Sequence, residues 1–281
     1  MKKTVFILAL FVGLTTMAQE KKVTPKSNWK KDGNITFLIN QSMFSNWVSG
    51  GDNTVAGNLG LNYDFNYAKD DWTWDNKIMA TYGLSNTKSN GQRKTDDSFE
   101  FNSLVGKKAT GNWSYSFFLN LRSQFSEGFD YVADPNATTP ISSFFSPGYL
   151  TFGPGMLWKK SDNFKINLSP ATNKLTFVSN ALAGSFGTDP GKTFKYELGF
   201  YASLYHKTTV MENVSMENIV SLFSNYLDKP QNIDISHQLN FVMQINKYLS
   251  TNLSFHTIID DDASSKVQFK EVFGLGVNYI F

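Results

Sequence analysis

Three polar side chains, His237, Asn218 and Thr257, interrupt the apolar faces of segments that the sequence predicts to be neighbouring strands. Hairpin register would place His237 roughly opposite the other two. An imidazole beside a hydroxyl and an amide could serve as base, nucleophile and orienting group in ester hydrolysis. The simpler explanation is that three mildly polar groups hydrogen-bond one another, because threonine is an uncommon nucleophile. Hydrolysis is therefore a minor alternative, and we expect no enzymatic activity.

The remaining candidate ligands do not predict a metal site. The run Asp260–Asp262 is consecutive and lacks the alternate spacing of a calcium-binding loop, so a solvated turn is favoured over a cation site. His206, His237 and His256 are expected in different parts of the fold and do not converge. The chain has no cysteine, which excludes disulfides, thiolate zinc sites and cysteine nucleophiles. We expect neither a metal nor a cofactor.

The elements that position these residues follow from the stretch Val55–Tyr67, in which apolar and polar residues alternate without a break. Such a period of two gives a β-strand one apolar and one polar face. At about 3.3 Å per residue the stretch is roughly 40 Å long, enough to cross a bilayer at a tilt. Similar segments recur to the last residue. The sequence therefore predicts an all-β protein, a transmembrane antiparallel up-and-down β-barrel of about 12 strands.

Composition agrees with a barrel, in which only every second strand residue meets lipid. Hydrophobic residues make up 41% of the 281 residues, too few for a helical membrane protein, yet 25 of the residues are phenylalanine. The formal charge of +2 and the presence of only two arginines give no basis for nucleic-acid binding. The composition therefore excludes a nucleic-acid partner and favours a lipid environment.

Several connections are less clear than the strands. The polar stretch Ser85–Asp96 and the stretch Ser126–Pro147 are expected to be loops. A short strand, Phe164–Leu168, is followed by Ser169–Lys192, which either extends that strand or folds as a loop. Pro154 predicts a bulge or a weak ladder in its strand. Long connections mostly follow odd strands and short ones follow even strands, so both termini are expected on the periplasmic side.

The N-terminus predicts secretion. Lys2 and Lys3 precede the apolar run Val5–Leu14, which is followed by small residues up to Ala18. Residues 1–18 are therefore expected to be a signal peptide cleaved near Ala18. Residues 19–32 are expected to be a periplasmic lead-in, and residues 33–281 the barrel, located in the cell outer membrane.

Two further patterns agree with a barrel in the outer membrane. Five of the six tryptophans are expected at the periplasmic rim as an aromatic girdle, namely Trp29, Trp72, Trp74, Trp113 and Trp158. Gly276, Tyr279 and the terminal Phe281 have the form of a C-terminal signal for the barrel-assembly machinery, although an ordinary amphipathic end strand is the alternative. We expect this machinery, outer-membrane lipid and lipopolysaccharide to be the partners of the chain.

Polar faces of the predicted strands would line the lumen. Their charged residues include Asp64, Asp75, Lys77, Glu100, Arg122, Lys165, Lys195, Glu197, Glu217 and Asp234. Because both signs are nearly balanced, these residues can pair across the lumen and fill it. A twelve-strand lumen lies between the small filled barrels and the wide porins. We expect either a structural barrel or a narrow passive pore with little charge selectivity.

The predicted outer loops suggest an alternative role. The stretches Ser126–Pro147 and Ser169–Lys192 contain more apolar side chains than solvated loops usually carry, namely Phe129, Tyr131, Phe144, Phe145, Leu182 and Phe186. Such side chains need a protein partner, lipopolysaccharide or burial in the lumen. A non-enzymatic accessory subunit of an envelope-assembly or export complex is thus the main alternative, and a lipid hydrolase using His237 is the minor one.

Four segments carry a family resemblance: Trp29–Asn53, Lys94–Tyr131, Ser146–Gly155 and Leu222–Ile235. In them the chain resembles a family of bacterial outer-membrane barrels known as domain of unknown function 3078. The resemblance implies a secreted, β-rich, outer-membrane protein and carries no established activity. Its characteristic polar and aromatic residues correspond here to Gln41, Asn46, Trp47, Gly50 and Gly51. They would form a ligand or partner contact at the outer end of the first strand, or only a loop of required geometry.

Overall fold

The computed structural model describes residues 27–45 and 52–281. The predicted signal peptide, most of the lead-in and the residues Asn46, Trp47, Gly50 and Gly51 lie outside the described residues. Gln41 is described and lies in the last part of the first strand. In the described ranges no helix is long and apolar enough to cross a membrane.

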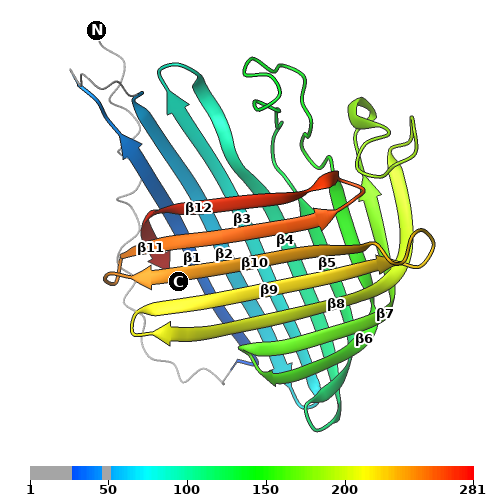
Figure 1. The fold of residues 1–281 in the computed structure, drawn as a ribbon. Coiled ribbons are helices and arrows are strands. Elements are labelled where there is room, and N and C mark those ends of the chain that lie inside the picture. The colour runs from blue at the N-terminus through cyan, green and yellow to red at the C-terminus, as the bar shows by residue number, and fades with distance from the viewer. Residues whose placement is uncertain (1–26, 46–51) are drawn as a thin grey trace.

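Twelve strands form a closed barrel in which each strand pairs with its neighbours in sequence and β1 pairs with β12. All pairings are antiparallel, which confirms the predicted fold. Figure 1 shows the longer connections at one end, the loop end, and tight turns at the other, the turn end. The strands are β1 (Trp29–Ser42), β2 (Thr54–Lys69), β3 (Trp72–Thr87), β4 (Gly91–Thr110), β5 (Trp113–Ser123), β6 (Gly148–Ser161), β7 (Phe164–Phe177), β8 (Phe194–Met211), β9 (Val214–Asn225), β10 (Ile233–Gln244), β11 (Leu249–Asp260) and β12 (Ser264–Ile280).

The distribution of side chains is the reverse of that in a water-soluble protein. Among the described residues only four hydrophobic side chains are buried, whereas the other buried side chains are polar or charged. Along β12, Phe273, Leu275 and Val277 are each more than half exposed on the outside, while Asn278 is buried inside. An apolar exterior around a polar interior is the arrangement of a membrane barrel. The period of two in the sequence is the direct cause, because it sends alternate residues to opposite faces.

Some strands are longer than the sequence predicts. The expected loop Ser85–Asp96 is only the turn Lys88–Asn90, because β3 and β4 continue as a polar hairpin. Strand β7 does not stop at Leu168 but runs to Phe177, with a register shift between Ser169 and Thr172. A bulge at this point keeps the strand in the sheet, although Pro170 cannot donate a hydrogen bond to the neighbouring strand.

Both ends of the barrel sequence lie at the closing seam. Strand β1 begins at Trp29 rather than at the expected Gly33. Gly33 and Phe281 exchange two backbone hydrogen bonds, each 2.9 Å long. A Cβ atom on Gly33 would lie 2.6 Å from the Phe281 ring, so glycine allows this close approach. The final residue therefore takes part in closing the barrel.

In β6, the register shift between Phe152 and Met156 confirms the irregularity predicted from Pro154.

Candidate functional site

The lumen is crossed by an ion pair between opposite walls. Lys77 of β3 places its Nζ 3.0 Å from Glu217 Oε1 of β9 and 3.4 Å from Asp64 Oδ2 of β2. Strands β3 and β9 are six positions apart in the ring of twelve, so this contact spans the lumen. The Tyr205 hydroxyl donates a 2.9 Å hydrogen bond to the same Glu217 oxygen. The pair is thus held in place from two walls.

A second contact crosses the lumen between β4 and β10. Gln238 Nε2 donates to Glu100 Oε2 at 3.0 Å, and the amides of Asn102 and Asn120 both donate to Glu100 Oε1 at 2.9 Å. Three amides therefore satisfy this carboxylate. We call the Lys77–Glu217 and Glu100–Gln238 contacts together the septum. They explain how a lumen with nearly balanced charges is filled by its own side chains.

Arg122 lies beside the septum without joining it. It is the register partner of Glu100 on β5. Within the described part of the chain it has no salt bridge to any carboxylate, and its buried Nε lacks a hydrogen-bond partner. Its guanidinium carbon lies 5.6 Å from the centroid of the Tyr149 ring. Among the described residues, the lumen thus contains an arginine that forms no salt bridge, although Glu100 lies opposite it on β4.

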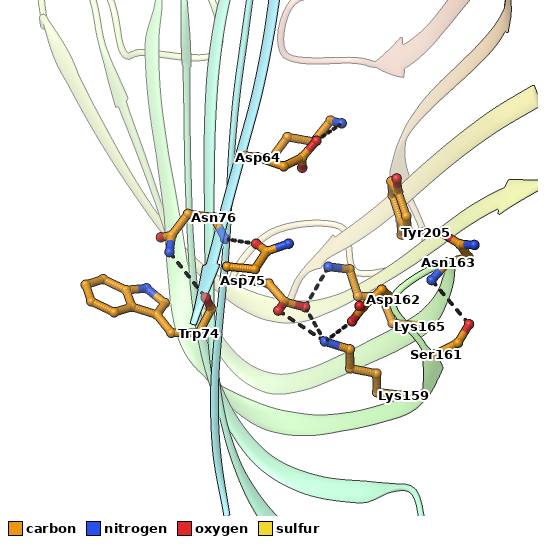
Figure 2. Close-up of polar contacts among 12 residues, drawn as sticks. Asp64, Trp74, Asp75, Asn76, Lys159, Ser161, Asp162, Asn163, Lys165 and Tyr205 are labelled. Carbon is orange, nitrogen blue, oxygen red and sulfur yellow. Dashed lines mark hydrogen bonds and ion pairs between the residues drawn. The ribbon is translucent and has the colours of Figure 1, made fainter. Parts of the chain in front are cut away.

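Near the turn end, one carboxylate joins two strands that are not its neighbours. Asp75 of β3, only 7% exposed, accepts from Lys159 of β6 and from Lys165 of β7, both with N–O distances of 2.9 Å. Figure 2 shows Asp75 pointing from its strand toward both ammonium groups, with Asp162 beside Lys159. This cluster narrows the interior between β3 and the β6–β7 hairpin.

Toward the loop end, Lys174 is surrounded by acids. Its Nζ lies 2.6 Å from Asp234, 3.6 Å from Glu197 and 3.8 Å from Asp260. Lys195 of β8 adds contacts of 3.3 Å to Glu197 and 2.5 Å to Asp262. These pairs tie β7, β8 and β10 to the β11–β12 hairpin inside the barrel. The ten charged residues expected to line the lumen all belong to these clusters, to the septum or to its margin.

Sequence reasoning missed several residues of this network. Lys159, Lys174, Gln238 and Lys270 face the interior and were not singled out, although alternation along their strands could have indicated them. Lys270 of β12 pairs with Asp96 of β4 at 2.8 Å. Asp96 was not assigned to the lumen because Ser85–Asp96 was expected to be a loop. Lys174 was not assigned because the structure of Ser169–Lys192 was left open.

Two cavities lie on either side of the septum. One has a volume of about 410 Å³ and is lined mainly by β3 to β10, and the other has about 900 Å³ and is lined mainly by β1 to β4 and β9 to β12. Lys77, Glu100, Arg122 and Gln238 line both of them. The septum therefore divides one polar lumen into two parallel compartments.

The other predicted residues lie on the outside. Trp29, Trp72 and Trp113 are the first residues of β1, β3 and β5. The ring centroids of Trp29 and Trp74 are 5.7 Å apart. Trp158 is the register partner of Trp113. All five tryptophans are thus at the turn end.

At the seam, the rings of Tyr279 and Phe281 stack at 5.9 Å, and the Phe281 ring stacks with Tyr63 at 5.8 Å. A Cβ atom on Gly276 would come within 3.0 Å of Leu38 on β1. These contacts fix the end of β12 on its neighbour β1. They give the predicted C-terminal residues a packing role at the turn end.

One hydrogen bond joins the polar residues of the outer face. His237 Nε2 lies 3.0 Å from Asn218 Oδ1, and Thr257 is the register partner of His237 on β11. In the described ranges no hydrogen bond joins Thr257 to the imidazole. No group of three or more acidic or histidine side chains in those ranges is arranged to hold a metal ion.

Comparison with protein families gives one match. Residues 39–129 match a family described as "Protein of unknown function (DUF3078)". The resemblance is confirmed for this segment. It includes the end of Trp29–Asn53 and nearly all of Lys94–Tyr131, whereas Ser146–Gly155 and Leu222–Ile235 lie beyond it. No curated protein matches the chain in sequence.

Solved structures that resemble the barrel include three from outer-membrane proteins or translocators. The COG4313 outer membrane channel from Pseudomonas putida F1 is 10% identical with a TM-score of 0.38, over 92% of this chain and 99% of that one. The translocator domain of the autotransporter NalP from Neisseria meningitidis is 11% identical with a TM-score of 0.34, over 92% and 90%. The outer membrane channel DcaP of Acinetobacter baumannii is 12% identical with a TM-score of 0.33, over 90% and 97%.

Proposed function

We propose that this chain is an outer-membrane β-barrel whose lumen is a narrow passive pore. The observation that carries the proposal is the extent of the larger cavity. It is lined by Ser215 and Gln244 near the turn end and by Gln124 and Ser142 near the loop end. The cavity therefore extends along the height of the barrel beside the septum, which supports a route for water and small solutes past the filled part of the lumen.

The charges along this route support weak selectivity. The larger cavity is lined by acids such as Asp64 and Glu217 and by bases such as Lys77, Arg122 and Lys270. Rings of one charge sign are what give a pore strong preference for cations or anions. A mixed lining provides no such ring, so both ions are expected to pass at similar rates.

An apolar exterior, aromatic residues at the turn end and a terminal phenylalanine support the proposed location. In this orientation the turn end faces the periplasm and the loop end faces outward. Outer-membrane lipid and lipopolysaccharide would surround the barrel. The barrel-assembly machinery would insert it after removal of a signal peptide near Ala18.

Conductance in planar bilayers tests the pore directly. Wild-type protein is expected to give small, steady currents with little preference between potassium and chloride. Replacing both Lys77 and Glu217 with alanine removes one of the two contacts of the septum and widens the passage between the two cavities. Because conductance follows pore diameter, we expect an increase of about twofold or more.

A matched control removes one charge of each sign away from the lumen. Lys107 and Glu212 are exposed at the turn end, so the Lys107→Ala/Glu212→Ala variant should conduct like the wild type. If neither the wild type nor the Lys77→Ala/Glu217→Ala variant conducts, the pore is refuted and only a structural barrel is left.

A second function is favoured by the loop end. Val132 is 98% exposed and Phe144 is 71% exposed, although the other aromatic side chains of these loops are partly buried. Phe186 lines the larger cavity, so its apolar side chain does not need a protein partner. Exposed apolar side chains at a loop tip suit a protein partner. Cross-linking in cells through a photoreactive residue at position 144 should capture a partner, and recovery of monomer alone would exclude this role.

A further inference from the structure

The seam between β1 and β12 closes only part of the barrel wall. Asn34–Ile39 of β1 pairs with Leu275–Ile280 of β12, and the pairing ends there. On its other side, β12 continues to pair with β11 as far as Ser264. Figure 1 shows that β1 and β12 diverge toward the loop end of the barrel. Among the described residues, Ser264–Phe273 therefore has no partner strand on the β1 side.

This free edge lies beside apolar surface. Beyond the end of the pairing, the outward row of β12 continues with Phe273, Phe269 and Val267, all well exposed. Unpaired backbone groups facing hydrocarbon are very costly, so a gap at this height must be reached by water or filled by a ligand. Glu271 is also exposed, in the same outward row, and a carboxylate is more compatible with a hydrated gap than with lipid tails.

The larger cavity reaches this gap. Its lining includes Leu38 of β1 and Val272 of β12, which face the interior on the two sides of the seam. It also includes Phe269, which belongs to the outward row in the unpaired part of β12. The far wall of the same cavity carries Arg122, which forms no salt bridge among the described residues and whose buried Nε has no hydrogen-bond partner. One compartment thus extends from the interior side of this gap to an arginine that forms no salt bridge.

We propose that the β1–β12 seam is a lateral opening through which a single-chain anionic amphiphile, of the long-chain fatty acid class, passes between the membrane and the larger cavity. Its carboxylate pairs with Arg122, because a guanidinium binds a carboxylate through two parallel hydrogen bonds. Its hydrocarbon chain lies along Leu38 and Val272 toward the bilayer. The cavity volume of about 900 Å³ is within the range of ligand sites for molecules of this size.

This inference rests on the proposed function only in using the same lumen. Passage of ions requires a continuous route between the two ends of the barrel, whereas the lateral opening requires a route from the bilayer to Arg122. Absence of conductance with intact fatty acid binding would refute the pore alone. Conductance without fatty acid binding would refute the lateral opening alone.

Disulfide trapping tests the opening itself, in a chain that has no cysteine of its own. Continuing the register of the paired segment would place Gln41 opposite Phe273, whereas Phe37 and Val277 are observed partners. Both pairs face outward and would be of the same hydrogen-bonded type, with Cα atoms about 5.5 Å apart if the strands were paired. We expect Phe37→Cys/Val277→Cys to cross-link on mild oxidation and Gln41→Cys/Phe273→Cys to remain reduced. Equal cross-linking of the two variants would overturn the proposal.

Photolabelling tests the ligand. A diazirine-bearing palmitic acid is added to the full-length protein in phosphatidylcholine vesicles, and labelled peptides are mapped by mass spectrometry. Label is expected around Leu38 and Val272. Arg122→Gln should reduce it by about tenfold, the equivalent of roughly 1.4 kcal/mol, whereas Arg122→Lys should retain most of it. Lys160→Gln, at an exposed position, is the matched control.

Folding of each variant is checked by its heat-dependent mobility on gels, so that loss of label is scored only for folded barrels. The methyl ester of the same probe has no carboxylate and should label wild type and Arg122→Gln equally. Label spread evenly over the outer face, or unchanged labelling by the acid in Arg122→Gln, would contradict the proposal.

Discussion

Removing the central cation of the septum is expected to destabilise the barrel strongly. In Lys77→Met the side chain keeps its length but loses its charge, leaving Glu217 without the ammonium 3.0 Å away and Asp64 without the one at 3.4 Å. The side chains of Lys77 and Glu217 are only 13% and 14% exposed, so water replaces the lost partner poorly. Breaking a buried pair by removing one member costs about 3–5 kcal/mol.

The lower end of that range applies here, because Tyr205 still donates a hydrogen bond to Glu217. A cost of about 3 kcal/mol changes the unfolding equilibrium by roughly a hundredfold. Glu217→Gln should cost less, about 1–2 kcal/mol, since its amide oxygen still accepts from Tyr205 and Lys77 retains Asp64. The Lys77→Met/Glu217→Gln variant should cost about 2 kcal/mol less than the sum of the single changes, because it leaves no uncompensated charge at position 217.

Urea unfolding in lipid vesicles, followed by tryptophan fluorescence and by gel mobility, measures these free energies of unfolding. The four proteins form a double-mutant cycle under one set of conditions. Strict additivity, or a loss below about 0.5 kcal/mol in Lys77→Met, would refute the view that this ion pair holds the two walls together.

Two further changes test how the wall is built. Gly155→Ala should destabilise the barrel by about 1–3 kcal/mol in the same urea assay, because its Cβ atom would clash with the backbone carbonyl oxygen of Leu168. Gly60→Ala should be nearly neutral, since the nearest atom to its Cβ would be 3.8 Å away. Equal effects of the two changes would contradict this packing argument. Deleting Phe281 removes two backbone hydrogen bonds to Gly33, whereas Phe281→Ala keeps both and removes only the ring. The fraction of folded barrel after refolding should therefore fall by more in the deletion than in Phe281→Ala. A larger fall in Phe281→Ala would show that the ring matters more than the backbone hydrogen bonds.

The septum gives a physical account of why the lumen of this barrel is narrow. Residues from opposite walls meet because lysine, glutamate and glutamine side chains are long enough to reach the middle of a twelve-strand ring. The pairing of opposite charges offsets part of the desolvation cost of placing many ionised groups in one interior. What passes beside the septum is then decided by the part of the lumen that these side chains leave open.

The sequence by itself determined the class of fold and the face on which each strand residue lies. Alternation along Val55–Tyr67 separates interior from exterior without any knowledge of neighbours, because a strand sends successive side chains to opposite sides. For the same reason Asp64, Asp75, Lys77 and Glu100 could be assigned to the interior. The turn-end tryptophans followed from where the strands begin.

Tertiary structure alone decided which of these residues meet. Alternation gives a side of the wall but neither the height of a residue in the barrel nor its position around the ring, so the contact between Lys77 and Glu217 could not be derived from it. It also could not show where pairing stops along the seam, because Gln41 and Phe273 continue the patterns of their strands beyond the point at which β1 and β12 separate. Tilt, register and the bulges that shift them arise only when all twelve strands close on one another, and these set the shape of the lumen.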